Sequence, residues 1–139
     1  MKSQIIWLRV AYWAGAIADG LALIPMLNMK VAAFLIQSPT VSPGWDFRYA
    51  SAFGAALMAG WTVLLIWADR KPMERRGVMV ITIFPVLSGI TLSRYFLYLG
   101  GYAPEAFPLQ SLILPIFLTV LYVFAYVNSF RSQRAVAAT

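Results

Sequence analysis

The sequence of 139 residues contains no cysteine and no histidine. Disulfide oxidoreductase chemistry is impossible without thiols, and the usual protein ligands of zinc, copper and haem iron are missing. A Ser-His or Cys-His nucleophilic pair cannot be assembled either. We therefore predict no metal site, no cofactor and no catalytic residue, and an enzyme is the least favoured class of function.

Charged side chains are also scarce, at 12% of the residues against roughly 25% in a usual globular protein. Hydrophobic residues make up 61%, which is more than so short a soluble chain can bury. The net charge of +6 would indicate nucleic-acid binding in a soluble protein, but no basic stripe interleaved with aromatics lies outside the apolar segments. The composition predicts an integral membrane protein that binds lipid and no nucleic acid.

Four apolar segments are each close to the roughly 20 residues that a helix needs to cross a bilayer; they are residues 5–27, 47–68, 78–99 and 109–127. The alternating short segments of a membrane β-barrel are absent, and helices are the other way to satisfy the backbone in lipid. We predict an all-α bundle of four transmembrane helices, with residues 1–139 forming one membrane domain. Residues 130–139 form a short cytoplasmic tail, disordered from Arg131 onward.

Basic residues fall mainly on one side of these segments. The connector 68–77 carries Arg70, Lys71, Arg75 and Arg76, and the same side includes Lys2, Arg9, Arg131 and Arg134. By the positive-inside rule both termini and this basic connector are cytoplasmic, and we expect a prokaryotic cytoplasmic (inner) membrane. The connector is also a candidate docking patch for anionic lipids or for a protein partner.

Small residues predict where helices approach closely, because association in lipid depends on tight packing. In residues 47–68 they form two neighbouring stripes, one of Ser51, Ala55 and Ala59 and one of Ala52, Ala56 and Gly60. Residues 5–27 have similar spacing at Ala11, Gly15, Ala18 and Ala22. We favour a contact between the first two spans within one chain, and a seam between the protomers of a homo-oligomer is the alternative.

Two further features interrupt the apolar pattern. Three prolines lie within spans, where proline bends a helix: Pro25, Pro85 and Pro115. Pro85 is also a candidate hinge, because Ser88 and Gly89 lie nearby. Residues 29–37 are apolar but too short to cross the membrane, so they predict either an interfacial helix or a re-entrant turn.

Asp19 is the sharpest candidate for function. It lies about eight residues, or roughly 12 Å of helix, inside the outer end of the first span, where an unpaired carboxylate costs several kcal/mol or more. Arg94 lies about five residues, or roughly 8 Å, inside the outer end of the third span. We expect an ion pair between them, which is either a structural salt bridge or a solvated site for a solute, an ion or a proton.

Other polar residues accompany this pair. The third span places hydroxyl groups around Arg94, at Ser88, Thr91, Tyr95 and Tyr98, and the fourth adds Thr119, Tyr122 and Tyr126 at helical spacing. These side chains either line a polar pocket or bond across helices. Arg48 and Asp46, at the outer start of the second span, rim the same cavity or act as an interfacial anchor and a helix cap.

The run from Trp67 to Gly77, W-A-D-R-K-P-M-E-R-R-G, followed by T-I-F-P-V at 82–86, resembles small four-span membrane proteins of prokaryotes with no assigned activity. The resemblance implies the four-helix architecture and no substrate. Two hypotheses for function follow. The first is a membrane protein that binds or transports a small solute or ion at Asp19 and Arg94. The second is a non-catalytic accessory or structural subunit of a larger membrane complex.

Overall fold

A computed structural model describes residues 2–36, 44–100 and 110–137, and within these ranges the chain is helical, with no strand. Its elements are α1 (Lys2–Leu27), α2 (Met29–Ile36), α3 (Trp45–Asp69), α4 (Gly77–Ile81), the π-helix η1 (Thr82–Leu87), α5 (Ser88–Leu99) and α6 (Gln110–Ala137). Because α4, η1 and α5 are continuous, the described chain has four helices long and apolar enough to span a membrane. The sequence prediction of an all-α fold with four such helices is confirmed.

The helical bounds lie within a few residues of the expected spans, except at the C-terminus. There α6 continues to Ala137, ten residues beyond the expected end of the fourth span at Val127. The expectation of disorder from Arg131 is therefore wrong as far as Ala137, and residues 138 and 139 lie outside the described ranges. The extension contains neither proline nor glycine and several good helix formers, so nothing in it ends the helix.

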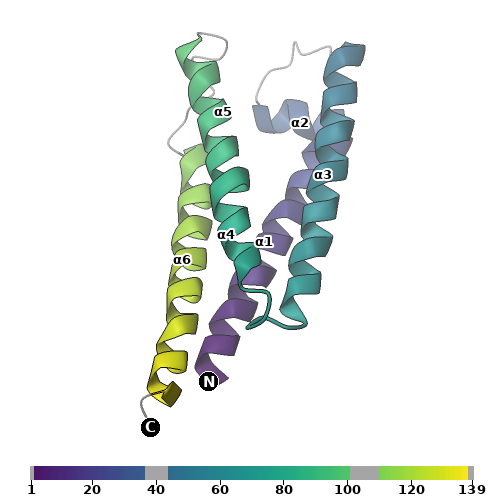
Figure 1. The fold of residues 1–139 in the computed structure, drawn as a ribbon. Helices are drawn as coiled ribbons and strands as arrows, with labels where there is room; N and C mark the ends of the chain where they lie inside the picture. The colour runs from purple at the N-terminus through teal and green to yellow at the C-terminus, as the bar shows by residue number, and fades with distance from the viewer. Residues whose placement is uncertain (1, 37–43, 101–109, 138–139) are drawn as a thin grey trace.

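The four long helices run alternately up and down, as Figure 1 shows. Helix α1 begins, and α6 ends, at the same end of the molecule as the α3–α4 connector. We call this the loop end and the opposite one the far end. The short α2 follows α1 at the far end, so the helix is the correct alternative for residues 29–36.

Helix α1 is the centre of the packing, because it contacts α3 most extensively and also packs against α6. Figure 1 shows α5 leaning away from α3 toward the far end. The main buried cluster joins α1, α3, α6 and the start of the third span; it includes Leu8, Tyr12, Leu65, Met79 and Tyr122. The core is thus concentrated toward the loop end, and the two sides of the bundle separate beyond it.

The two stripes of small residues on α3 have different surroundings. Ala55 is only 3% exposed, and its stripe neighbours Ser51 and Ala59 are half-buried. Ala52, Ala56 and Gly60, on the neighbouring stripe, are exposed. Together with the extensive α1–α3 contact, this confirms the contact between the first two spans within one chain and leaves the second stripe uncovered.

Pro85 lies inside η1, where the helix widens from α to π geometry for one and a half turns. Proline has no N–H to donate and its ring crowds the preceding turn, so a widened turn accommodates it within a continuous rod. At the start of η1, the buried Thr82 accepts a hydrogen bond from Trp61 Nε1 of α3 at 3.3 Å. The π segment is therefore tied directly to the second span.

Candidate functional site

Asp19 and Arg94 both lie in the far half of the bundle, Asp19 half-buried on α1 and Arg94 exposed on α5. Helix α1, which carries Asp19, packs mainly against α3 and α6. A shared site of Asp19 and Arg94 stays a prediction.

The residue that approaches the face of α1 carrying Asp19 is Tyr122 of α6. Its side chain is 1% exposed, and its hydroxyl makes no hydrogen bond within the described part of the chain. This hydroxyl lies directly over Gly15, where an added Cβ would overlap it and would also lie 3.1 Å from Leu65 Cδ1. Gly15 thus lets α1, α3 and α6 meet, with a phenol oxygen at the junction.

Tyr12, Gly15 and Asp19 follow one another at three- and four-residue spacing and therefore share one face of α1. From α6, the Tyr122 hydroxyl approaches this face at Gly15. At the loop end of this face the Tyr12 hydroxyl donates a hydrogen bond of 2.9 Å to the Arg75 carbonyl. The geometry assembles a row of oxygen atoms on α1 and α6, from the connector at the loop end to Asp19 in the far half.

Ser88, Thr91 and Tyr95 line one groove of about 540 Å³ between the third span and α6, together with Thr119. The Thr91 and Thr119 hydroxyls each donate at 2.8 Å to a carbonyl in their own helix, Leu87 and Pro115 respectively. Most other lining side chains are aliphatic, so the groove presents a largely apolar surface. Tyr98 lies exposed farther along α5 and is not among the lining residues.

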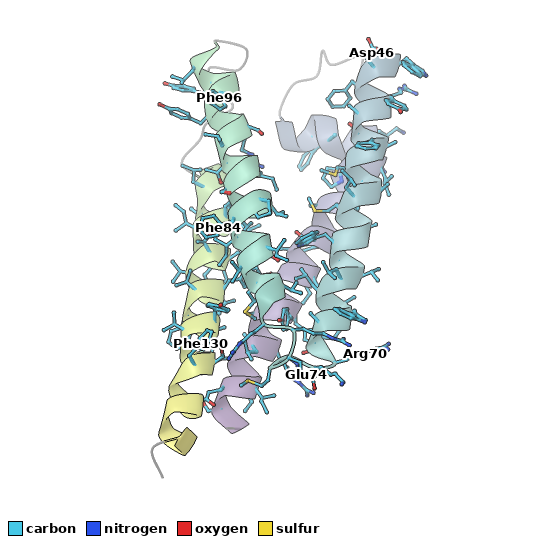
Figure 2. The ribbon with its side chains drawn as sticks, in the orientation of Figure 1. Asp46, Arg70, Glu74, Phe84, Phe96 and Phe130 are labelled. Atoms are coloured by element: carbon cyan, nitrogen blue, oxygen red, sulfur yellow. The ribbon has the colours of Figure 1, made fainter. Side chains whose placement is uncertain are left out.

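Arg48 and Asp46 lie exposed at the far end of α3, where Figure 2 labels Asp46. The N-cap residue of α3 is Gly44, without a side-chain capping bond, and Asp46 lies in the first turn. The expectation that Asp46 caps the helix is therefore wrong, although the helix dipole still stabilises a carboxylate in the first turn.

The basic connector at the loop end is organised by contacts with aromatic rings and with helix ends. The Arg75 guanidinium lies 3.4 Å from the centroid of the Trp67 ring and donates to the Trp67 carbonyl in the last turn of α3, where a cation is favourable. The Arg76 guanidinium lies 3.9 Å from the centroid of the Phe130 ring on α6. These two arginines therefore hold the connector against α3 and α6.

The other two connector cations are more exposed. Lys71 forms a 3.1 Å ion pair with Glu74, three residues later, and both side chains are mostly exposed. Arg70 is exposed as well, and Figure 2 shows Arg70 and Glu74 at the loop end. Of the four basic residues that the sequence singles out, Arg70 and Lys71 are thus the ones presented outward.

One polar cluster was missed by the sequence reasoning. Asp69 Oδ1 lies 3.7 Å from Arg9 Nε, and Trp13 Nε1 donates to Asp69 Oδ2 at 3.3 Å. Asp69 is the more buried partner, with its side chain 19% exposed against 56% for Arg9. The available signal was the four-residue spacing of Arg9 and Trp13, which puts both on one face of α1 at the height where α3 ends.

Among the described residues, no cluster of three or more acidic side chains could hold a metal ion. Comparisons of the chain with models of known protein families, with curated proteins and with solved structures find no match.

Proposed function

We propose that this chain is an integral protein of a prokaryotic cytoplasmic membrane that binds, and moves, a small solute or ion at a polar site in the far half of the bundle. Asp19 and Arg94 are its charged groups. Both termini and the basic connector face the cytoplasm, so the site faces the outside. The observation that carries the proposal is the half-buried Asp19 on the face of α1 that the Tyr122 hydroxyl of α6 approaches. This hydroxyl makes no hydrogen bond within the described part of the chain.

The physical argument starts from the cost of placing a carboxylate in the apolar half of a bilayer, which is several kcal/mol without a partner. A protein that keeps Asp19 there gains nothing in packing, because an alanine would fit the same small-residue face. Asp19 lies toward the far end of α1 and is only half-buried. An approach for a solute from that side is consistent with this arrangement.

The test is native mass spectrometry of the protein extracted gently from its own membrane. We expect the wild type to carry a bound small molecule or ion, and Asp19→Asn and Arg94→Gln each to lose it. Asp46→Asn is the matched control, because it removes an exposed carboxylate at the same end. A wild type without any bound species, or an Asp19→Asn variant that retains it, would contradict the proposal.

The charge swap Asp19→Arg with Arg94→Asp separates a site from a structural pair. If the two residues form only a salt bridge, the swap restores part of the folding that each single change loses. If they form a binding site, the doubly substituted protein folds and carries no bound species.

A second candidate is an accessory subunit or a homo-oligomer, and the uncovered stripe of Ala52, Ala56 and Gly60 favours it. Small residues four apart allow two membrane helices to approach closely, and the outward Arg70 and Lys71 offer a docking patch for a partner or for anionic lipid. The same mass spectra separate the cases: a stoichiometric foreign polypeptide indicates an accessory subunit, and a multiple of the chain mass indicates a homo-oligomer.

A further inference from the structure

The contact between α1 and α6 places the Tyr122 hydroxyl on the face of α1 that also carries Asp19. The Tyr122 hydroxyl lies over Gly15, and Asp19 is one helical turn farther along the same face. Side chains on a helix lean toward its N-terminus, so the Asp19 carboxyl leans back toward Gly15 and the hydroxyl. No hydrogen bond of 3.5 Å or less joins the two groups. One water molecule can bridge a donor and an acceptor that are too far apart for a direct hydrogen bond.

The surroundings of Asp19 contain few other ionisable groups. The middle of α3, between Tyr49 and Asp69, has no titratable side chain. Helix α2 contributes Lys30, which is exposed, and α6 contributes Tyr122 itself. Within α1 the next ionisable group toward the loop end is Tyr12, whose hydroxyl donates to the Arg75 carbonyl. Among the ionisable groups of the helices packed against α1, Tyr122 is therefore the one whose oxygen lies on the face that carries Asp19.

A metal cation would require more ligands than this arrangement provides. Calcium takes six to eight oxygen atoms and magnesium demands a full octahedron, whereas one carboxyl and one phenol are available here. A proton requires only one oxygen and one hydrogen-bond partner. The phenol suits both protonation states, because it accepts a hydrogen bond from a carboxylic acid and donates one to a carboxylate.

We propose that Asp19 is a proton-binding site whose hydrogen-bond partner is Tyr122, either directly or through one water molecule. This deepens the proposed function and rests on it for the role of the site, since it adds a proton to the solute or ion bound there. A hydronium ion reaching Asp19 from the far end gives its proton to a carboxylate oxygen, which forms an O–H bond and leaves water. The Tyr122 hydroxyl then changes from donor to acceptor without either helix moving.

Infrared difference spectroscopy across a pH titration, with the protein in lipid nanodiscs, tests this proposal. The C=O stretch of a protonated carboxyl is expected in the wild type, shifted in D₂O. Asp19→Asn should lose this band, whereas the control Asp46→Asn should keep it. Asp19→Glu retains a carboxyl and should show a displaced band, so the test stands even if the asparagine variant fails to fold.

Tyr122→Phe provides the second part of the test. The wild-type C=O band should change frequency in Tyr122→Phe, because the hydrogen-bond partner is lost while Asp19 remains. Tyr126→Phe, one turn along α6, is the matched control and should leave the band unchanged, since the Tyr126 ring packs against Phe130. A band that Asp19→Asn retains, or that responds equally to both tyrosine variants, would overturn the proposal.

The outcomes also separate this inference from the proposed function. If the Asp19 band titrates but the protein carries no bound solute, the proton site is supported and the solute-binding function is contradicted. If the protein carries a solute but the Asp19 band never appears, the binding function is supported and the proton site is contradicted.

Discussion

The packing of three helices in this bundle depends on the absence of a side chain at Gly15. Its Cα faces the Tyr122 ring, with the ring carbon that bears the hydroxyl only 3.0 Å from where a Cβ would lie. Leu65 of α3 closes the same space from the other side. Gly15 therefore limits how closely α1, α3 and α6 can pack. It also allows Tyr122 to reach the face of α1 that carries Asp19.

We predict that Gly15→Ala lowers the free energy of unfolding by about 1–3 kcal/mol, the usual cost of overpacking a core. Gly20→Ala, in the same helix with no atom near its Cβ position, should be neutral or slightly stabilising, because alanine has the higher helix propensity. Denaturation in mixed detergent micelles measures both. Adding Tyr122→Phe to Gly15→Ala should recover part of the loss, because it removes the overlapping oxygen. Equal stability of Gly15→Ala and Gly20→Ala would show that α6 does not pack here.

For single residues, the sequence predicted which face of α1 is packed better than it predicted which side chain packs against that face. The spacing of Ala11, Gly15 and Ala18 indicated a close helix contact, and the position of Asp19 indicated the same face. It did not indicate that Tyr122 would be the side chain to fill this face, because periodicity on one helix does not say which helix covers it. The choice of Arg94 as the partner of Asp19 came from comparable depth alone, and depth leaves the lateral arrangement of the helices undetermined.

Among the elements, η1 is the one that links the two sides of the bundle. Thr82 donates to the Val78 carbonyl at 2.8 Å and accepts from Trp61 Nε1, so its hydroxyl serves α4 and α3 together. Thr91 makes the same bond to the carbonyl four residues earlier, without a second partner on another helix. The two threonines on one span therefore form a natural comparison.

We expect Thr82→Val to lower the free energy of unfolding by roughly 1–2 kcal/mol, since it leaves the half-buried Trp61 N–H without its acceptor. Thr91→Val should change stability by less than about 0.5 kcal/mol, because its bond stays within one helix. The same denaturation experiment measures both. If the two variants lose equal stability, the bond across helices contributes nothing.

The elements themselves were largely predictable, because segment length and hydropathy report directly on membrane-spanning helices. The π geometry at Pro85 was not, since proline predicts a disturbance of the helix without saying whether it becomes a kink, a break or a widened turn. The continuation of α6 to Ala137 was not predicted either, although this segment has no residue that breaks a helix.

For the whole molecule, the fold decides which chain segments lie at the same end of the bundle. The distribution of basic residues decides which side of the membrane that end faces. An even number of antiparallel spans puts the start of α1, the connector and the end of α6 at one end. Arg75 and Arg76 are engaged with Trp67 and Phe130, which leaves Arg70 and Lys71 as the cations whose replacement disturbs the fold least.

We predict that a fluorescent protein fused to the C-terminus fluoresces in the cytoplasm and that alkaline phosphatase fused there is inactive. Replacing both Arg70 and Lys71 with glutamine should increase the share of reversed molecules, because the positive-inside bias falls by two charges. Lys30→Gln with Arg48→Gln removes the same charge from the opposite end and should leave the orientation unchanged. An active C-terminal phosphatase in the wild type would reverse the assignment.

The contact between α1 and α6 joins the first of the four described spans with the fourth, which is synthesised later. Tyr122 leaves the ribosome about 100 residues after Asp19, a delay of roughly 5 to 20 seconds at usual rates of translation. During that interval the Asp19 carboxyl on α1 faces lipid or the insertion machinery. By then α3 has been synthesised, but α6 has not. Truncation before α6 should therefore leave α1 without the side chain that covers Gly15 and should expose the chain to proteolytic quality control.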